Sequence, residues 1–319
     1  MIWLIGAGPM AIEYGRVLQA LGHKFICITR SQTSATSFVS QFDQQVFAGG
    51  LEQFLNTSPL CPSHAIVATG IETLSPLTSL LICYGVKSVL VEKPGGMGLE
   101  NIIHLAELSK KAANSLFVAY NRRFYASVIK AEELIKKDGN ISSMNYEITE
   151  WSHIIEGLKQ SPEIKSKCFI ANTSHVVDLA FYLGGRPKQL SCFTADKTSW
   201  HPESANFAGA GVTEKKALFV YHGNWNAPGR WSLEVLTRKH RFIFRPMEKL
   251  QIQRIGSVAI EEVDIDLHYD NEFKPGLYKQ TEAFLNNDTI KLCSISEHLL
   301  NMDIYYRMAG YECNDGMND

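Results

Sequence analysis

The sequence predicts an α/β protein in which a parallel, doubly wound sheet is followed by an α+β domain with an open, mainly antiparallel sheet. Strand-like and helix-like stretches alternate up to about residue 120, and a glycine turn follows the first strand. Strand-like runs without long helices between them then fill residues 189–266. We therefore place one domain at residues 1–121 and a second at 122–319, with a C-terminal helix that could pack back on the first.

The composition indicates a globular protein with a small-molecule partner. With 319 residues, 45% of them hydrophobic, the chain can bury a sizeable core. A net charge of -2 gives no reason to expect nucleic acid or an acidic membrane as partner. The seven cysteines include no Cys-x-x-Cys pair, so neither disulfides nor a metal site is predicted. No signal-peptide pattern or bilayer-spanning apolar run is evident, which predicts a cytoplasmic location.

The first strand, residues 2–5, leads into a glycine turn and a helix. The turn reads Gly-Ala-Gly-Pro-Met-Ala over residues 6–11. Gly6 permits the tight turn, and Gly8 lets a pyrophosphate approach the backbone in front of the helix N-terminus. This pattern predicts a Rossmann domain that binds NAD(P) through Gly6, Gly8, Pro9 and Met10.

The second strand, residues 25–29, ends where an NAD-binding domain usually places an acidic residue against the ribose 2′-hydroxyl. This chain has Arg30 and Ser31 there instead. No carboxylate would repel a 2′-phosphate, and the Arg30 guanidinium could bind it, so NADP is predicted in preference to NAD. The alternative is that Arg30 is an ordinary solvated loop residue.

Four more strands complete the predicted parallel sheet. The one at residues 64–68 ends in Thr69-Gly70, which would lie beside the nicotinamide, although Thr-Gly is also an ordinary turn sequence. The other strands are expected at 45–47, 86–91 and 116–119, and the clearest helices at 72–84 and 100–113.

The strand at residues 86–91 runs directly into Glu92, Lys93 and Pro94. Open α/β sheets bind their ligands at the carboxyl ends of the strands, and a proline restricts the residue before it to extended geometry. A lysine held there, beside a nicotinamide, can stabilise negative charge on a substrate oxygen, with Glu92 orienting it. The alternative is a solvated pair of surface charges.

Three motifs together resemble those of the Gfo/Idh/MocA oxidoreductase family over nearly the whole chain. They are the glycine turn at 6–11, Glu92-Lys93-Pro94, and Tyr-Asn-Arg-Arg-Phe at 120–124. The resemblance implies hydride transfer to or from a carbon–oxygen centre of a sugar or nucleotide-sugar. It also implies that Lys93 faces the reacting oxygen, usually before a cis proline bond, and that the open sheet forms a homodimer or homotetramer. Tyr120, Arg122 and Arg123 are expected near the substrate.

A helix predicted over residues 172–185 carries His175. In the family, this helix bears an Asp and, four residues later, a His that acts together with the lysine. His175 matches that histidine, but the position of the Asp holds Ala171, so Asn172 or Ser174 could contribute hydrogen bonds only. We expect His175 to be catalytic and Asn172 to bind substrate. The alternative is that His175 is a hydrogen-bonded core residue.

The rest of the second half predicts a helix at 125–138, a strand at 141–148, an antiparallel sheet and a final helix at 295–310. Trp225 and Trp231 bracket a Pro-Gly turn, and they could form either a sugar platform or part of the core. Residues 314–319 are expected to be disordered.

An NADP-preferring oxidoreductase is the first functional hypothesis. Because the helix lacks the Asp, a non-catalytic cofactor-binding sensor or scaffold is an alternative. A reductase of another small molecule, tetrapyrrole-like or dihydrodiol-like, is a third. The sequence leaves the substrate, the direction of the reaction and the number of subunits open.

Overall fold

The structure of the chain is a computed structural model that describes residues 1–311. The disorder predicted for 314–319 lies outside the described residues. The described residues fold into two compact units, residues 1–121 with 268–299, and residues 122–267 with 300–311. Residues 268–299, assigned from the sequence to the second domain, thus belong to the first unit. Among residues 1–311, no helix combines the length and the apolar character that crossing a membrane requires.

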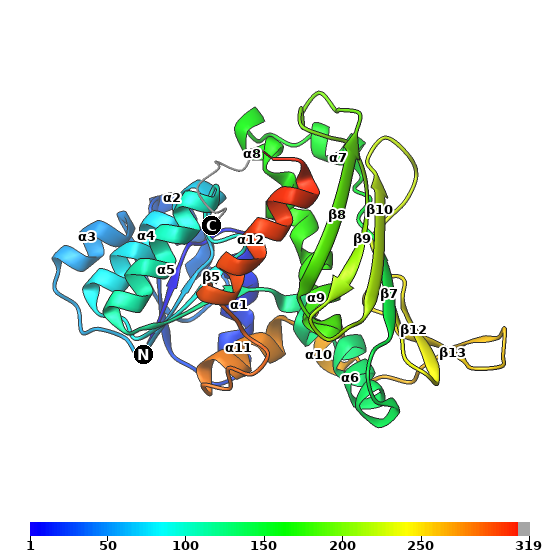
Figure 1. The fold of residues 1–319 in the computed structure, drawn as a ribbon. Helices are drawn as coiled ribbons and strands as arrows, with labels where there is room; N and C mark the ends of the chain where they lie inside the picture. The colour runs from blue at the N-terminus through cyan, green and yellow to red at the C-terminus, as the bar shows by residue number, and fades with distance from the viewer. Residues whose placement is uncertain (312–319) are drawn as a thin grey trace. The chain divides into compact units, whose positions relative to one another are not determined.

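The first unit alternates strands and helices in the predicted manner (Figure 1). Its strands are β1 Ile2–Ile5, β2 Phe25–Thr29, β3 Gln45–Ala48, β4 His64–Val67, β5 Ser88–Glu92, β6 Ser115–Ala119 and β15 Cys293–Ser294. Its helices are α1 Pro9–Ala20, α2 Gln32–Val39, α3 Gly50–Asn56, α4 Ile71–Tyr84, α5 Leu99–Ala112, α10 His268–Glu272 and α11 Leu277–Leu285.

These strands form one sheet in the order β15-β6-β5-β4-β1-β2-β3. Strands β1 to β6 run parallel, and β15 pairs antiparallel with β6. Because the strand order reverses at β1 and such crossovers are right-handed, the connecting helices cover both faces of the sheet. Central strands β4 and β5 are therefore almost continuously buried and apolar. The predicted doubly wound parallel sheet is confirmed.

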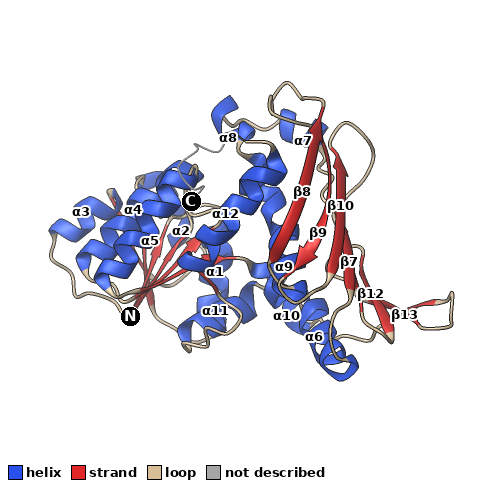
Figure 2. Ribbon diagram, in the orientation of Figure 1, coloured by secondary structure: helices blue, strands red, loops and turns tan. Residues whose placement is uncertain are grey.

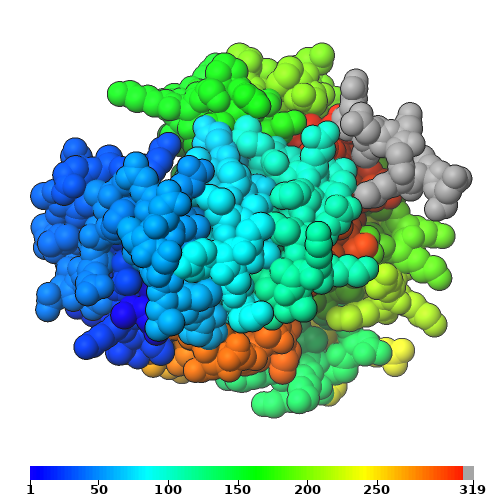
Figure 3. Space-filling view, turned by 90° about the vertical axis from the view of Figure 1, so that its left-hand side faces the viewer, coloured from blue at the N-terminus to red at the C-terminus, as the bar shows by residue number. Residues whose placement is uncertain are grey.

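The late segment of the first unit packs on its first helix. Arg16 of α1 donates from its NH2 group to the Glu272 carbonyl oxygen at 3.0 Å, and its guanidinium carbon lies 5.8 Å from the Phe273 ring centroid. In the space-filling view, the orange surface of this segment borders the blue and cyan surface of the N-terminal residues (Figure 3). Sequence order alone did not predict this return of the chain.

The second unit is an α+β arrangement (Figure 2). Its strands are β7 Ser143–Glu147, β8 Pro187–Ala195, β9 Asn206–Thr213, β10 Leu218–Asn224, β11 Ser232–Leu236, β12 His240–Phe244, β13 Gln251–Arg254 and β14 Ile260–Glu262. Its helical elements are the 3-10 turn Asn121–Phe124 at the boundary, α6 Ala126–Asp138, α7 Ser152–Glu156, α8 Pro162–Ser166, a π-helical turn Phe169–Thr173, α9 Ser174–Gly184 and α12 Ile295–Ala309, whose first residues belong to the first unit.

The second sheet has the order β14-β13-β12-β11-β7-β10-β9-β8. All its neighbours pair antiparallel except β7 and β10, which run parallel at its centre. Helix α9 covers one face, where the Phe181 ring lies 5.1 Å from that of Phe219 and 5.9 Å from that of Tyr146. The mainly antiparallel open sheet that the sequence predicts is confirmed.

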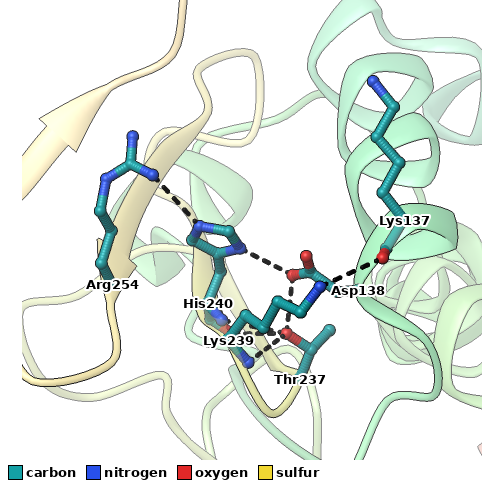
Figure 4. A network of polar contacts seen from close by, with 6 residues as sticks. All are labelled: Lys137, Asp138, Thr237, Lys239, His240 and Arg254. Atoms are coloured by element: carbon teal, nitrogen blue, oxygen red, sulfur yellow. Dashed lines mark hydrogen bonds and ion pairs between the residues drawn. The ribbon is translucent and has the colours of Figure 1, made fainter.

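A polar network fastens the end of α6 to this sheet (Figure 4). The Asp138 carboxylate accepts hydrogen bonds from His240 Nδ1 at 2.7 Å and Thr237 Oγ1 at 2.8 Å. Arg254 donates to His240 Nε2 at 3.5 Å, which assigns the ring proton to Nδ1. The network joins the C-terminus of α6 to the turn between β11 and β12.

Candidate functional site

The glycine turn of the first unit has the geometry that a dinucleotide needs. Gly6 has φ +116°, and a Cβ atom there would collide with the backbone oxygen of Ala68 on the neighbouring strand. Around Gly8, by contrast, a Cβ atom would meet nothing within 4 Å. Gly6 therefore makes the turn, and Gly8 leaves open space beside the backbone, as the sequence predicts for a bound pyrophosphate.

Helix α1 begins directly behind this space. Pro9 occupies its first turn, and among the described residues no side chain caps the helix at Gly8. The backbone N–H groups of the first turn, including that of Met10, therefore remain available at the positive end of the helix dipole. The residues present fit a phosphate-bearing cofactor.

The other predicted cofactor residues lie along the same edge of the sheet. Strands β5, β4, β1 and β2 are parallel neighbours, so their carboxyl ends coincide. Lys93, Thr69, Gly6 and Arg30 follow those four ends in turn. The strand order reverses between β4 and β1, which is where such folds bind their ligands.

Arg30 and Ser31 differ in what they are free to contact. Arg30 is exposed at the end of β2. The Ser31 hydroxyl caps helix α2, because its oxygen accepts a hydrogen bond from the Ser34 backbone N–H at 3.1 Å. Arg30 is thus the residue of this pair with a solvent-accessible charge.

Glu92 is a buried carboxylate at the end of β5. Tyr14 of α1 donates its hydroxyl to Glu92 Oε1 at 2.8 Å. Burial raises the pKa of Glu92, opposed by the nearby charge of Lys93 and by the Tyr14 hydrogen bond. Burial and the Glu92 charge raise the pKa of Tyr14, so the phenol remains a donor. The carboxylate is fixed beside Lys93, which is itself half-buried.

The backbone after Lys93 is held by a residue that the sequence did not single out. The Lys93–Pro94 peptide bond is cis, as the family resemblance implied. His298, which is fully buried, donates from Nε2 to the Pro94 carbonyl oxygen at 3.0 Å, and the Tyr120 hydroxyl lies 3.4 Å from its Nδ1. Tyr120 is therefore a buried support for this loop within the first unit, although we expected it near the substrate.

The second unit has its own polar cluster, centred on Glu150. This buried carboxylate accepts hydrogen bonds from the Asn172 amide at 3.1 Å to each oxygen, from Thr173 Oγ1 at 2.6 Å and from Arg230 NH1 at 3.1 Å. Burial raises the pKa of Glu150, and these three partners oppose the rise. The cluster brings in the predicted residue Asn172, whereas Glu150 and Thr173 were missed because no motif marks them and their partners come from segments that only the fold brings together.

Aromatic and cationic groups lie next to this cluster. The Arg230 guanidinium carbon lies over two indoles, 4.8 Å from the Trp151 ring centroid and 4.4 Å from the Trp231 ring centroid. Arg122 lies 4.9 Å from the Trp231 ring, and the His175 ring is 6.3 Å from it. Trp231 thus gathers the predicted residues Arg122 and His175 around one side of the second unit.

Trp225 belongs to the core. Its ring is stacked 5.3 Å from that of Trp200, and its Nε1 donates to the Ile148 carbonyl oxygen at 2.9 Å. Of the two alternatives for this tryptophan, the structure favours core packing over a sugar platform.

Arg123 also lies in the core, where we had expected a substrate contact. Its guanidinium makes a two-pronged ion pair with Asp178 of α9, with distances of 2.8 Å from Nε and 2.6 Å from NH2. The side chains of Arg123 and Asp178 are 2% and 0% exposed. The pair joins the 3-10 turn to α9, and this structural role replaces the substrate role predicted for Arg123.

Ala171 lies within the π-helical turn that precedes α9. Such turns insert extra backbone and are frequent at functional sites. Its methyl group supplies no acid. Within residues 1–311, no group of three His, Cys, Asp or Glu side chains is arranged to hold a metal ion.

No model of a known protein family matches the sequence, and no curated protein matches it. Solved structures do match. UDP-N-acetylglucosamine 3-dehydrogenase GnnA from Acidithiobacillus ferrooxidans aligns with a TM-score of 0.75 at 12% identity, covering 97% of both chains. An NAD-binding oxidoreductase from Klebsiella pneumoniae aligns with a TM-score of 0.76 at 12% identity, over 96% of this chain and 95% of that one. The dehydrogenase MviM from Clostridium difficile aligns with a TM-score of 0.76 at 17% identity, over 96% of this chain and 97% of that one. These are oxidoreductases of the Gfo/Idh/MocA type, so the fold that the motifs predicted is confirmed.

Proposed function

We propose that the protein is an NAD(P)-dependent oxidoreductase that transfers hydride to or from a carbon–oxygen centre of a sugar or nucleotide-sugar. The observation that carries this proposal is the edge of the first sheet. There the open glycine turn and the uncapped α1 N-terminus follow β1, next to the point where the strand order reverses, and Lys93 follows β5, one strand further along the sheet beyond β4. The dehydrogenase activity of a structural relative on a UDP-sugar supports the substrate class. A cytoplasmic location is part of the proposal.

A bound nicotinamide would supply the hydride acceptor or donor. The chain supplies the remaining groups. The Lys93 ammonium would donate a hydrogen bond to the reacting oxygen and stabilise its developing negative charge. We also propose His175, which is 4% exposed in the second unit, as the proton-exchanging group. Asn172 and Arg122 would contact the substrate.

Replacing Lys93 by alanine tests the enzyme assignment. We expect Lys93→Ala to lower kcat by about a hundredfold or more, because the group that would stabilise negative charge on the reacting oxygen is lost. Turnover is followed at 340 nm on a panel of sugars and nucleotide-sugars, and cofactor affinity is measured by calorimetry. Cofactor affinity should stay within a few-fold of the unaltered protein.

Lys87→Ala is the matched control, because Lys87 is an exposed lysine just before β5, at the opposite edge of the sheet. It should leave turnover unchanged. Unchanged turnover in Lys93→Ala would refute the catalytic assignment of Lys93.

For the cofactor, we propose NADP over NAD, supported by the exposed Arg30 at the end of β2 and by the lack of a carboxylate there. Arg30→Ala should weaken NADPH binding by about tenfold or more, the range for losing hydrogen bonds to a charged group, and should leave NADH binding unchanged. Calorimetric titration of both proteins with both cofactors measures this difference. Tighter binding of NADH by the unaltered protein would contradict the preference.

Ala171 motivates a second candidate, a non-catalytic NAD(P)-binding sensor or scaffold. Like the enzyme proposal, this candidate binds the cofactor at the carboxyl edge of the first sheet, but it catalyses no reaction. It predicts NADPH binding without oxidation or reduction of any substrate in the panel, whereas the enzyme proposal requires turnover.

A further inference from the structure

The second unit contains a buried carboxylate that the proposed reaction leaves without a task. Glu150 lies three residues beyond β7, and its side chain is 1% exposed. Burying a charge is costly unless it is paired and hydrogen-bonded, and here hydrogen bonds arrive from Asn172, Thr173 and Arg230. These three polar side chains thus hold one buried carboxylate in place.

The carboxylate dictates how the Asn172 amide is turned. Asn172 Nδ2 lies 3.1 Å from both oxygens of Glu150. A carboxylate paired with an arginine only accepts hydrogen bonds, so the opposite amide orientation would set oxygen against oxygen. The Asn172 Oδ1 atom is therefore directed away from Glu150, as a fixed hydrogen-bond acceptor.

Glu150 and Asn172 differ in their exposure to solvent. Glu150 is closed off from solvent, so it cannot itself touch a substrate, while Asn172 is partly exposed. Asn172 lies in the π-helical turn that leads into α9, next to Ala171 and three residues before His175. Asn172 thus presents a hydrogen-bond acceptor next to Ala171, the position at which the family's helix carries an Asp.

We propose that Glu150 is a positioning residue for the substrate. It acts through the Asn172 carboxamide, holding Oδ1 as the acceptor for a substrate hydroxyl group. The assignment rests on the proposed oxidoreductase function. Glu150 neither gains nor loses a proton in this role, and its effect on the substrate passes entirely through the orientation of one amide. The substrate group that this acceptor selects is a hydrogen-bond donor, which the hydroxyl groups of the proposed sugar substrate supply.

Exchanging the two functional groups tests this proposal. In Glu150→Gln the amide is no longer anchored by charge, and in Asn172→Asp two carboxylates face each other. Each single change should lower kcat/KM for the substrate by about tenfold or more, the range for hydrogen bonds to charged groups. The double variant Glu150→Gln/Asn172→Asp restores a donor opposite an acceptor and should recover most of that loss, with the KM for cofactor unchanged throughout.

The control is a similar set of groups elsewhere in the same unit. Asn145 Nδ2 donates to Glu234 Oε2 at 3.2 Å, and Arg241 lies 3.6 Å from the same oxygen. Glu234→Gln and Asn145→Asp should leave kcat/KM unchanged. Melting temperatures measured for every variant separate loss of folding from loss of positioning. If Glu150→Gln does not fold, the partly exposed Asn172→Asp and the double variant carry the test.

Single variants with unaltered kcat/KM would overturn the role of Glu150, and so would a folded double variant no better than the singles. Equal losses in the Asn145 and Glu234 controls would also overturn it. A separate failure is visible in the unaltered protein. If that protein binds cofactor yet turns over no member of the panel, the proposed function is refuted, and the assignment of Glu150 falls with it.

Discussion

At the scale of single residues, Glu150 and Glu92 show two different uses of a buried carboxylate. Glu150 is surrounded by an arginine, a hydroxyl and an amide, and it orients one of them. Glu92 has the Tyr14 hydroxyl as a hydrogen-bond partner and lies beside Lys93 in the sequence. Burial raises the pKa of both groups. Placement of a carboxylate beside the proposed catalytic lysine therefore costs folding stability at neutral pH.

This cost gives a pH-dependent prediction for Glu92→Gln. The folded state holds the Glu92 proton more tightly than the unfolded state, whose carboxyl titrates near its ordinary value of 4.5. The stability contributed by this group is therefore fully present below that value and is lost as pH rises through the raised folded pKa. The amide does not ionise, so Glu92→Gln should raise the melting temperature at pH 7, and the gain should shrink as pH falls toward 4.5. Calorimetric melting across this pH range measures it.

Glu107→Gln, on an exposed position of α5, is the control and should follow the curve of the unaltered protein. A Glu92→Gln variant that is less stable at pH 7 than at acid pH, relative to the unaltered chain, would contradict the argument. It would show that the Tyr14 hydrogen bond and the Lys93 charge outweigh the cost of burial.

At the scale of elements, the first half of the chain was readable because its signals are local. The strands of the parallel sheet are short apolar runs, and the helices carry an apolar stripe, so their order fixes the topology. The glycine turn and Lys93 were found for the same reason, since each directly follows a strand.

Strand β9 shows why parts of the second half were missed. Its sequence is rich in glycine and alanine, which favours neither strand nor helix. In the structure, Gly209 and Gly211 lie against the rings of Tyr221 and Phe219 of β10, so small residues make room for large ones on the neighbouring strand. This complementarity exists only once the strands are paired, and a single sequence does not reveal the pairing.

Contacts between segments far apart in the sequence also limited what could be predicted of the site. The parallel contact between β7 and β10 pairs residues 75 positions apart, such as Ser143 and Leu218, and Glu150 meets Arg230 across a separation of 80 residues. The π-helical turn that aims Asn172 at Glu150 leaves no mark in the hydrophobic pattern. His175 and Asn172 were identifiable through a family motif, and Trp231 through its place beside a Pro-Gly turn, whereas Glu150 and His298 depend on the tertiary structure.

At the scale of the whole molecule, one face of the second sheet exposes apolar side chains. Helix α9 packs on the other face, yet Phe193, Leu218 and Val220 are 69%, 63% and 53% exposed. The strand register places Phe193 opposite Ala208, and Val220 opposite Ala210, so these apolar side chains share one face across β8, β9 and β10. An apolar face of this kind is typical of protein–protein contact.

We propose that a second copy of the chain covers this face, as expected for the homodimer or homotetramer predicted from the sequence. Phe193→Asp combined with Val220→Lys should then convert the oligomer into a monomer, because burying two charges on a formerly apolar contact removes its driving force. Light scattering after size-exclusion chromatography gives the mass directly. Leu60→Lys, at a loop position that is 91% exposed in the first unit, is the control and should keep the oligomer intact. An unaltered chain that elutes at the mass of one subunit at micromolar concentration would refute the proposal. An oligomer that persists with both substitutions would show that the subunits contact each other through another surface.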